Sequence, residues 1–181
     1  GPISSQFVLK DPTVDFAVLE CARGGILKSG LAFQNCEVAV VTNVAADHMG
    51  LGGIHTIEAM AKVKAVVPET VFAHGYAVLN ADDDLVYRMK DDLKCNIGLF
   101  SMDENNPRIK EHAAEHGLSC VYENGYVTLM KGNWKIRVLD VKKIPLTYEG
   151  KAVHNINNCL PAVLSAYLFR DITIEDIRTG L

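Results

Sequence analysis

The chain has 181 residues, of which 49% are hydrophobic and 22% charged, so it is long enough for one domain with its own core and has no compositional sign of disorder. A net charge of −4 offers no basic surface for nucleic acid. No apolar run approaches the roughly 20 residues of a membrane-spanning helix, and the first residues do not resemble a signal peptide. Five cysteines without a C-x-x-C pair favour reduced thiols. We therefore expect a cytoplasmic protein that binds neither nucleic acid nor membranes.

The first part of the chain predicts a strand at residues 16–19, after an ambiguous stretch at 1–13. Glu20 follows this strand. A carboxylate there is costly unless it is solvated, paired with Arg23 or bound to a cation, and the residues alone leave these interpretations open. A glycine-rich turn and a short helix follow and end near Gly30.

The strongest strand signal lies at residues 38–41, where four apolar residues, three of them β-branched, are typical of a strand buried on both faces. After Asn43 comes a glycine-rich loop that carries Asp47 and His48. Ligands of open α/β sheets bind beyond the carboxyl ends of the strands, so this acid and imidazole are candidates for a site. The alternative is a turn or a surface pair.

A helix is predicted over residues 56–67, with Thr56 as its cap and Pro68 at its end. Helical spacing places Lys64 on the apolar, inward face of this helix, whereas Lys62 points away. An inward lysine either extends its ammonium group along apolar neighbours to water or serves a site.

The next elements alternate in type: a strand at residues 76–80, a short helix to Met89, a strand at 96–100 and a helix at 107–116. This alternation predicts a parallel sheet. Asp83 or Asp84 either caps the short helix or contacts a substrate or nucleotide.

After Ser119 the pattern changes to short apolar runs separated by turns. Asn124 and Gly125 form the strongest two-residue hairpin signal, a third strand is predicted at residues 134–139, and a fourth at 143–146. We therefore expect an α/β fold with a mostly parallel sheet flanked by helices and a small antiparallel meander at about residues 119–146.

An apolar stripe predicts a long helix that includes residues 156–167, and Thr173 caps a last short helix. Proline fits best in a first helical turn, so Pro161 suggests that the long helix begins nearer Asn158 than His154. Polar residues gather at its start: His154, Asn155, Asn157 and Asn158. One asparagine suffices for a cap, and carboxamides also recognise the edge of a base such as adenine.

Together these motifs resemble the central, ATP-binding domain of the Mur ligase family over nearly the whole chain. The stretches that carry the resemblance are DPTVD at residues 11–15, LECARGGIL at 19–27, VTNVAADHMGLG at 41–52, NADD at 80–83 and HNINN at 154–158. The RGGIL and GLGG stretches point to the branch of the family that makes cyanophycin, a polymer of aspartate and arginine.

The resemblance implies an enzyme that uses ATP to turn a carboxylate into an acyl phosphate, which an amine attacks to form an amide. Glu20 and His48 would hold Mg²⁺. Lys64 occupies the position at which many relatives carry a carbamylated lysine, and Arg23 would be a further catalytic residue. The substrates implied are aspartate, arginine and a cyanophycin primer.

The resemblance also implies nucleotide-contacting residues at His154, Asn155, Asn158 and Asp83, with Asn158 the better match to the residue that contacts adenine. The phosphate-binding loop of the family, G-x-x-x-x-G-K-[ST], does not occur in residues 1–181, and neither does a third, carboxyl-terminal domain. We therefore expect a single middle-domain fragment that is inactive by itself.

Two other functions stay open. One is a different ligase of the family, such as a peptidoglycan precursor ligase or a folylpolyglutamate synthetase. The other is a non-catalytic interaction module that keeps the fold. If the strand before the missing loop is also absent, the sheet has an open edge beside residues 16–19, so we expect self-association into a homo-oligomer.

Overall fold

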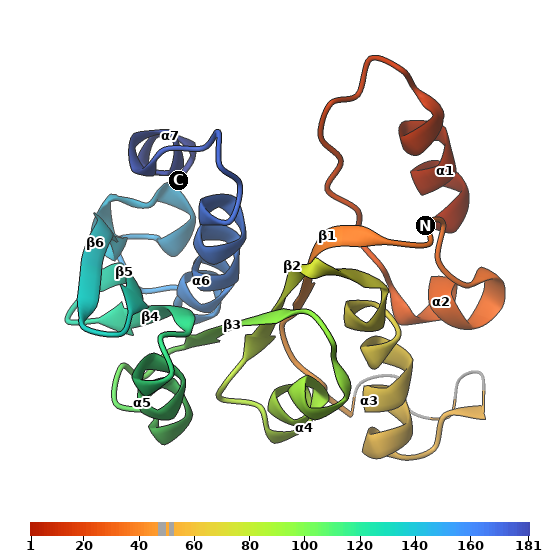
Figure 1. Ribbon diagram of the computed structural model, residues 1–181, viewed down its shortest axis with the longest axis horizontal. Coiled ribbons are helices and arrows are strands. Elements are labelled where there is room, and N and C mark those ends of the chain that lie inside the picture. Colours follow the sequence, from red (N-terminus) through yellow and green to blue (C-terminus); the bar gives the residue numbers. More distant parts are fainter. Residues whose placement is uncertain (47–49, 51–52) are drawn as a thin grey trace.

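The computed structural model describes residues 1–46, 50 and 53–181. Its centre is one six-stranded sheet whose strands follow each other in chain order (Figure 1). The strands are β1 (Cys36–Val41), β2 (Val71–Asn80), β3 (Asn96–Ser101), β4 (Leu118–Glu123), β5 (Tyr126–Lys131) and β6 (Trp134–Asp140). β1 to β4 are parallel, and β5 and β6 are antiparallel additions. The predicted mostly parallel sheet with an antiparallel meander is confirmed, and the meander continues the same sheet.

Helices cover both faces of the sheet (Figure 1). α3 (Ile57–Ala65), α4 (Asp84–Arg88) and α5 (Pro107–Ala114) lie on one face, α6 (Val153–Tyr167) lies on the other, and α7 (Ile174–Gly180) follows α6. Phe100 and Leu160 are fully buried in the apolar cluster under α6, and Leu79 and Met60 are buried in the cluster on the opposite face. In the described part of the chain, no helix is long and apolar enough to cross a membrane.

Side-chain caps define where several helices begin. The Thr56 hydroxyl accepts a hydrogen bond from the Ala59 amide at the start of α3. Thr173 and Asp176 form a capping box at the start of α7. The caps predicted at Thr56 and Thr173 are confirmed.

The hairpin between β4 and β5 is also as predicted. Asn124 and Gly125 have φ values of 48° and 88°, the left-handed region that a two-residue turn of this kind requires. Glu123 and Tyr126 face each other across the turn.

The predicted strand at residues 16–19 is wrong, because this segment is irregular and pairs with no strand in the described part of the chain. α1 (Pro2–Lys10) and α2 (Arg23–Ser29) lie on either side of it and contact each other. A strand is held by ladder hydrogen bonds to a neighbour. β1 is at the end of the sheet and pairs only with β2 among the described strands, so the open edge belongs to β1 and not to residues 16–19.

The predicted strand at residues 143–146 is also wrong. The chain forms two short 3₁₀ turns there, Val141–Lys143 and Pro145–Thr147. The buried Thr147 hydroxyl donates to the Ile144 carbonyl at 2.9 Å and accepts from the Gly150 amide at 3.1 Å. These local bonds satisfy the Ile144 carbonyl and the Gly150 amide, so neither group needs a partner in a neighbouring strand.

The long helix α6 begins at Val153, so the expected start near Asn158 is wrong and Pro161 lies inside the helix. Proline in a helix interior removes one backbone hydrogen bond. The apolar stripe of α6 is nevertheless buried against the sheet, with Leu160 and Leu164 fully covered. Packing of this stripe, more than local preference, determines where the helix extends.

Candidate functional site

The candidate site lies at the edge of the sheet formed by the carboxyl ends of the parallel strands, here called the carboxyl edge. β1, β2 and β3 end there because they run in the same direction. β6 is antiparallel to β5 and therefore also ends at this edge, and α6 begins after the two 3₁₀ turns that follow β6. The first turn of α6 and the exits of three strands thus share the side on which open α/β sheets bind ligands.

Three side chains hold the backbone at the point where the chain leaves β1. The Asn80 amide donates to the Thr42 carbonyl (2.7 Å), the Lys64 ammonium donates to the Asn43 carbonyl (2.6 Å), and the Asp83 carboxylate accepts from the Val44 amide (2.7 Å). We call Lys64, Asn80 and Asp83 the exit clamp. The clamp joins α3, β2 and the start of α4 to three consecutive residues of the chain.

Lys64 has the orientation expected from helical spacing. It is half buried, and its ammonium group reaches the end of β1, whereas Lys62 is exposed. The Lys64 side-chain nitrogen therefore lies at the carboxyl edge, next to a backbone carbonyl.

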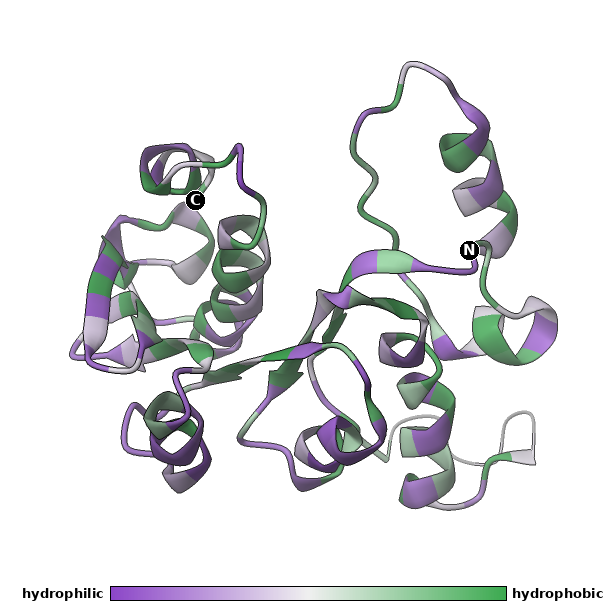
Figure 2. Ribbon diagram, viewed as in Figure 1, coloured by the Kyte–Doolittle hydropathy of each residue, from purple (hydrophilic) through white to green (hydrophobic). Residues whose placement is uncertain are grey.

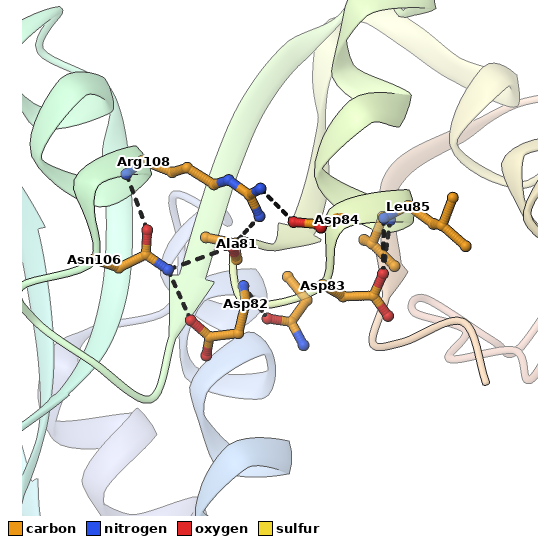
Figure 3. Close-up of polar contacts among 9 residues, drawn as sticks. Ala81, Asp82, Asp83, Asp84, Leu85, Asn106 and Arg108 are labelled. Atoms are coloured by element: carbon orange, nitrogen blue, oxygen red, sulfur yellow. Dashed lines mark hydrogen bonds and ion pairs between the residues drawn. The ribbon is translucent and has the colours of Figure 1, made fainter.

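Asp83 caps α4, in agreement with one of the two interpretations of the sequence. One carboxylate oxygen accepts from the amides of Leu85 and Val86, both at 3.0 Å (Figure 3). The other oxygen accepts from Val44, outside the helix. The carboxylate therefore links the start of α4 to the exit of β1.

Asp82 fills a different role beside it. Its carboxylate accepts from the Ser101 hydroxyl at 2.6 Å, the Met102 amide at 2.7 Å and the Asn106 side chain at 2.8 Å. The bonds from Ser101 and Met102 tie the exit of β2 to the exit of β3. The bond from Asn106 ties it to the start of α5 (Figure 3). A residue with this many protein partners is a structural anchor of the carboxyl edge.

Arg108 completes this anchor and was not singled out in the sequence. Its guanidinium donates to the Ala81 carbonyl at 2.8 Å and forms an ion pair with Asp84 (Figure 3). The hydrogen bond from Arg108 lowers the pKa of the Asp84 carboxyl below its usual value. No local pattern identifies Arg108, because its partners lie 24 and 27 positions earlier in the chain.

The polar residues at the start of α6 divide into two groups. The Asn155 side chain donates to the Leu146 carbonyl at 2.6 Å and so fastens the helix to the preceding 3₁₀ turn. His154 and Asn158 are exposed, and neither side chain makes a hydrogen bond within the described part of the chain. The exposed carboxamide of Asn158 is thus open to a ligand, whereas the Asn157 side-chain oxygen is buried without a hydrogen-bond partner among the described residues.

The N-terminal site residues are less closely connected to the carboxyl edge. Glu20 is exposed in the irregular segment before α2, and Arg23 is the half-buried first residue of that helix. Glu20 forms no hydrogen bond or ion pair with Lys64 among the described residues. His48, like Asp47, lies outside the described residues. Within residues 1–46, 50 and 53–181, no three His, Cys, Asp or Glu side chains converge as a metal-binding group.

Comparison with known proteins identifies the relatives of this chain. The profile of the Mur ligase middle domain matches residues 3–166. The cyanophycin synthetases of Geminocystis herdmanii and of a Synechocystis strain are 53% and 52% identical over the whole chain, which spans 21% of the length of each. UDP-N-acetylmuramate–L-alanine ligase of Acetivibrio thermocellus is 31% identical over 148 residues, 80% of this chain and 28% of that protein. The chain therefore belongs to the Mur ligase family, and residues 3–166 match its middle domain.

Proposed function

We propose that this chain is the nucleotide-binding part of an ATP-dependent amide ligase that adds arginine to the aspartate side chains of a growing polymer. The observation that carries the proposal is the similarity to cyanophycin synthetases along the entire chain. The polar groups at the carboxyl edge support it, because this is where an α/β sheet of this kind receives a nucleotide.

The reaction proposed has two steps. An aspartate carboxylate oxygen attacks the terminal phosphorus of ATP, ADP leaves, and an acyl phosphate remains. The arginine amine then attacks the acyl carbon, inorganic phosphate leaves, and the amine loses a proton. The protein contributes mainly by positioning these groups and by stabilising the charge on the phosphoryl oxygens.

The exposed carboxylate of Glu20 supports a magnesium site. Mg²⁺ binds through one or two carboxylates together with substrate phosphates, and it keeps several waters. Glu20 is exposed and makes no hydrogen bond in the described part of the chain, so its oxygens are open to a hard cation. We propose Glu20 as a magnesium ligand, with His48 as a second one. The bound ion would offset negative charge on the transferred phosphoryl group.

The remaining predicted residues take roles that follow from their positions. Lys64 brings its amine to the carboxyl edge, either as an ammonium group facing phosphate oxygens or, after carbamylation, as an anion that holds a second metal. Arg23 is proposed to act beside Glu20. Asn158, with His154 and Asn155 in the same helical turn, is proposed to contact the adenine base.

The full-length enzyme tests this proposal. With ATP, aspartate, arginine and a cyanophycin primer, we expect phosphate release that depends on both amino acids and on magnesium, together with polymer growth. Asn158→Ala should raise the KM for ATP about tenfold, since a good hydrogen bond contributes roughly one factor of ten. Val153→Ala, at an exposed position in the first turn of α6, is the control and should leave this KM unchanged.

Two outcomes would favour other functions. Activity with peptidoglycan precursors or folates in place of aspartate and arginine would indicate a different ligase of the family. Calorimetry of magnesium nucleotide binding then tests the non-catalytic alternative. If wild type and a variant with both Glu20→Ala and His48→Ala show equal affinity and equal turnover, the protein is an interaction module.

We also propose a cytoplasmic location and a homo-oligomer. All five cysteines are free thiols, which is typical of reducing compartments. The unpaired edge of β1 exposes backbone hydrogen-bonding groups and the Val40 side chain, which is 39% accessible. Light scattering should show association that Val40→Lys weakens. A wild-type monomer at high concentration would contradict the association.

A further inference from the structure

Two members of the exit clamp hold one peptide group. The Asn43 carbonyl, which accepts from Lys64, and the Val44 amide, which donates to Asp83, belong to the same peptide bond. This bond is trans, so its C=O and N–H point in opposite directions from a rigid plane. Lys64 and Asp83 therefore hold a single plane from its two sides.

We propose that Asp83 is a positioning residue for Lys64 and acts through this peptide group. When the carboxylate holds the Val44 amide, the Asn43 carbonyl is fixed in the direction of the Lys64 ammonium. Asn80 fixes the preceding carbonyl, at Thr42, and so limits rotation of the neighbouring plane. The inference rests on the proposed ligase function, in which Lys64 works at the phosphate site.

Burial explains why the Asp83 bond is needed. Val44 is only 7% accessible, so its amide has little access to water and requires a protein acceptor. Within the described residues that acceptor is Asp83, which approaches from a segment 39 positions later. Without the Asp83 acceptor, rotation of the peptide plane can give the Val44 amide another acceptor. The Asn43 carbonyl rotates with the same plane.

The two oxygens of Asp83 allow the positioning role to be separated from the cap. In Asp83→Asn, the side-chain carbonyl still accepts from Leu85 and Val86, and asparagine caps a helix as well as aspartate does. The new NH₂ group cannot accept from the Val44 amide. This variant therefore keeps α4 and removes only the bond to the exit of β1.

Steady-state kinetics of the full-length enzyme gives the main readout. Since a misplacement of about 1 Å can reduce a rate by about a hundredfold, we expect kcat to fall between tenfold and a hundredfold in Asp83→Asn. The KM for ATP should stay within about twofold, because the proposed role involves no contact with the nucleotide. An unchanged kcat, or a raised KM for ATP with normal kcat, would overturn the proposal and favour direct nucleotide contact in the second case.

Asp84→Asn is the matched control. It changes the next residue in the same way and weakens only an exposed ion pair with Arg108, which contributes little. We expect its kcat to stay within about twofold of wild type. A loss as large as that of Asp83→Asn would show that any charge change at the start of α4 impairs the enzyme, and would overturn the specific role of Asp83.

Amide hydrogen exchange supplies a readout that needs no ligase activity. In the full-length protein, a peptide containing Val44 should exchange faster in Asp83→Asn than in wild type, whereas a peptide covering Leu85 and Val86 should not change. Unchanged exchange at Val44 would overturn the clamp. If the enzyme shows no activity with aspartate and arginine, the proposed function fails, and the exchange result still decides whether Asp83 holds this peptide group.

Discussion

Two short apolar runs in this chain have nearly the same local pattern and different structures. Residues 16–19 and 38–41 each contain four apolar residues next to polar ones. The second run lies in β1, paired with β2, and Val41 is only 5% accessible. The first run is irregular, and Val18 is 88% accessible. An apolar run therefore forms a strand only where a neighbouring strand is available to hydrogen-bond with it.

The contrast extends to the regions around these runs. Figure 2 shows hydrophobic segments in α1 and in the chain that follows it, away from the two faces of the sheet. Ile3 and Phe7 are each 72% accessible, whereas Phe100 and Leu160 are fully buried. The N-terminal segment thus contains apolar side chains that are not packed in a core. Removing one of them should therefore cost much less stability than removing an apolar side chain from the sheet core.

The largest expected effect tests this contrast directly. Phe100→Ala removes a fully buried ring and should lower the free energy of unfolding by about 3–5 kcal/mol. Phe16→Ala removes an exposed ring whose aromatic contact is an edge-on pair with Phe169 at 4.7 Å, and should cost about 1 kcal/mol. Urea denaturation of the two variants measures the difference. Equal losses would mean that the N-terminal segment belongs to the main core.

A smaller effect is expected at a buried charge in the meander. Glu123 is 4% accessible, and its carboxylate is bonded by Thr128, Lys135 and Arg137. Glu123→Gln removes the charge from these bonds and should lower the free energy of unfolding by about 2 kcal/mol at pH 7. Thr128→Val, which removes only the neutral donor, should cost less.

The lowered pKa of Glu123 predicts that the stability of the protein depends on pH. Hydrogen bonds from Arg137 and then Lys135 lower the pKa of Glu123 from 4.5 to about 2. Because the pKa is lower in the folded state, the stabilisation is complete above pH 4.5 and is lost as the pH falls toward 2. Denaturation of wild type and Glu123→Gln at several pH values should show their difference shrinking across this window. A difference that stays constant down to pH 2 would contradict the charge-based explanation.

The cap of the last helix should give a more modest loss. In Thr173→Ala, the Asp176 amide loses its side-chain acceptor, and we expect a cost of about 1 kcal/mol in thermal or urea denaturation. Thr173→Ser keeps the hydroxyl and should recover most of this stability. Equal stability of the alanine and serine variants would show that α7 contributes nothing to cooperative unfolding.

The smallest effect is expected in residues 16–19, which pair with no strand in the described part of the chain. Val18→Ser changes a side chain that is 88% accessible and should alter the stability of this chain by less than about 0.5 kcal/mol. The same substitution in the full-length protein sharpens the comparison. A clearly larger loss there would show that residues 16–19 gain a packing partner in the complete enzyme.

The start of α4 shows how much of the site the sequence predicted. Asp83 was expected to cap this helix or to contact a nucleotide, and the cap is confirmed. Its second bond, to Val44, has no signature in the sequence, because the partner is a backbone amide 39 positions away. The partners of Asp82 and Arg108 have no such signature either, because they lie 19 to 27 positions away, at the exits of β2 and β3 and the start of α5.

Local chemistry was enough to predict the turn at Asn124, the caps at Thr56 and Thr173, and the inward direction of Lys64, because each depends on residues within about four positions. The tertiary structure decided where apolar runs became strands, how far α6 extends through Pro161, and which groups hold the exit of β1. These features depend on hydrogen bonds and packing between distant segments, and such partners exist only after the sheet has formed.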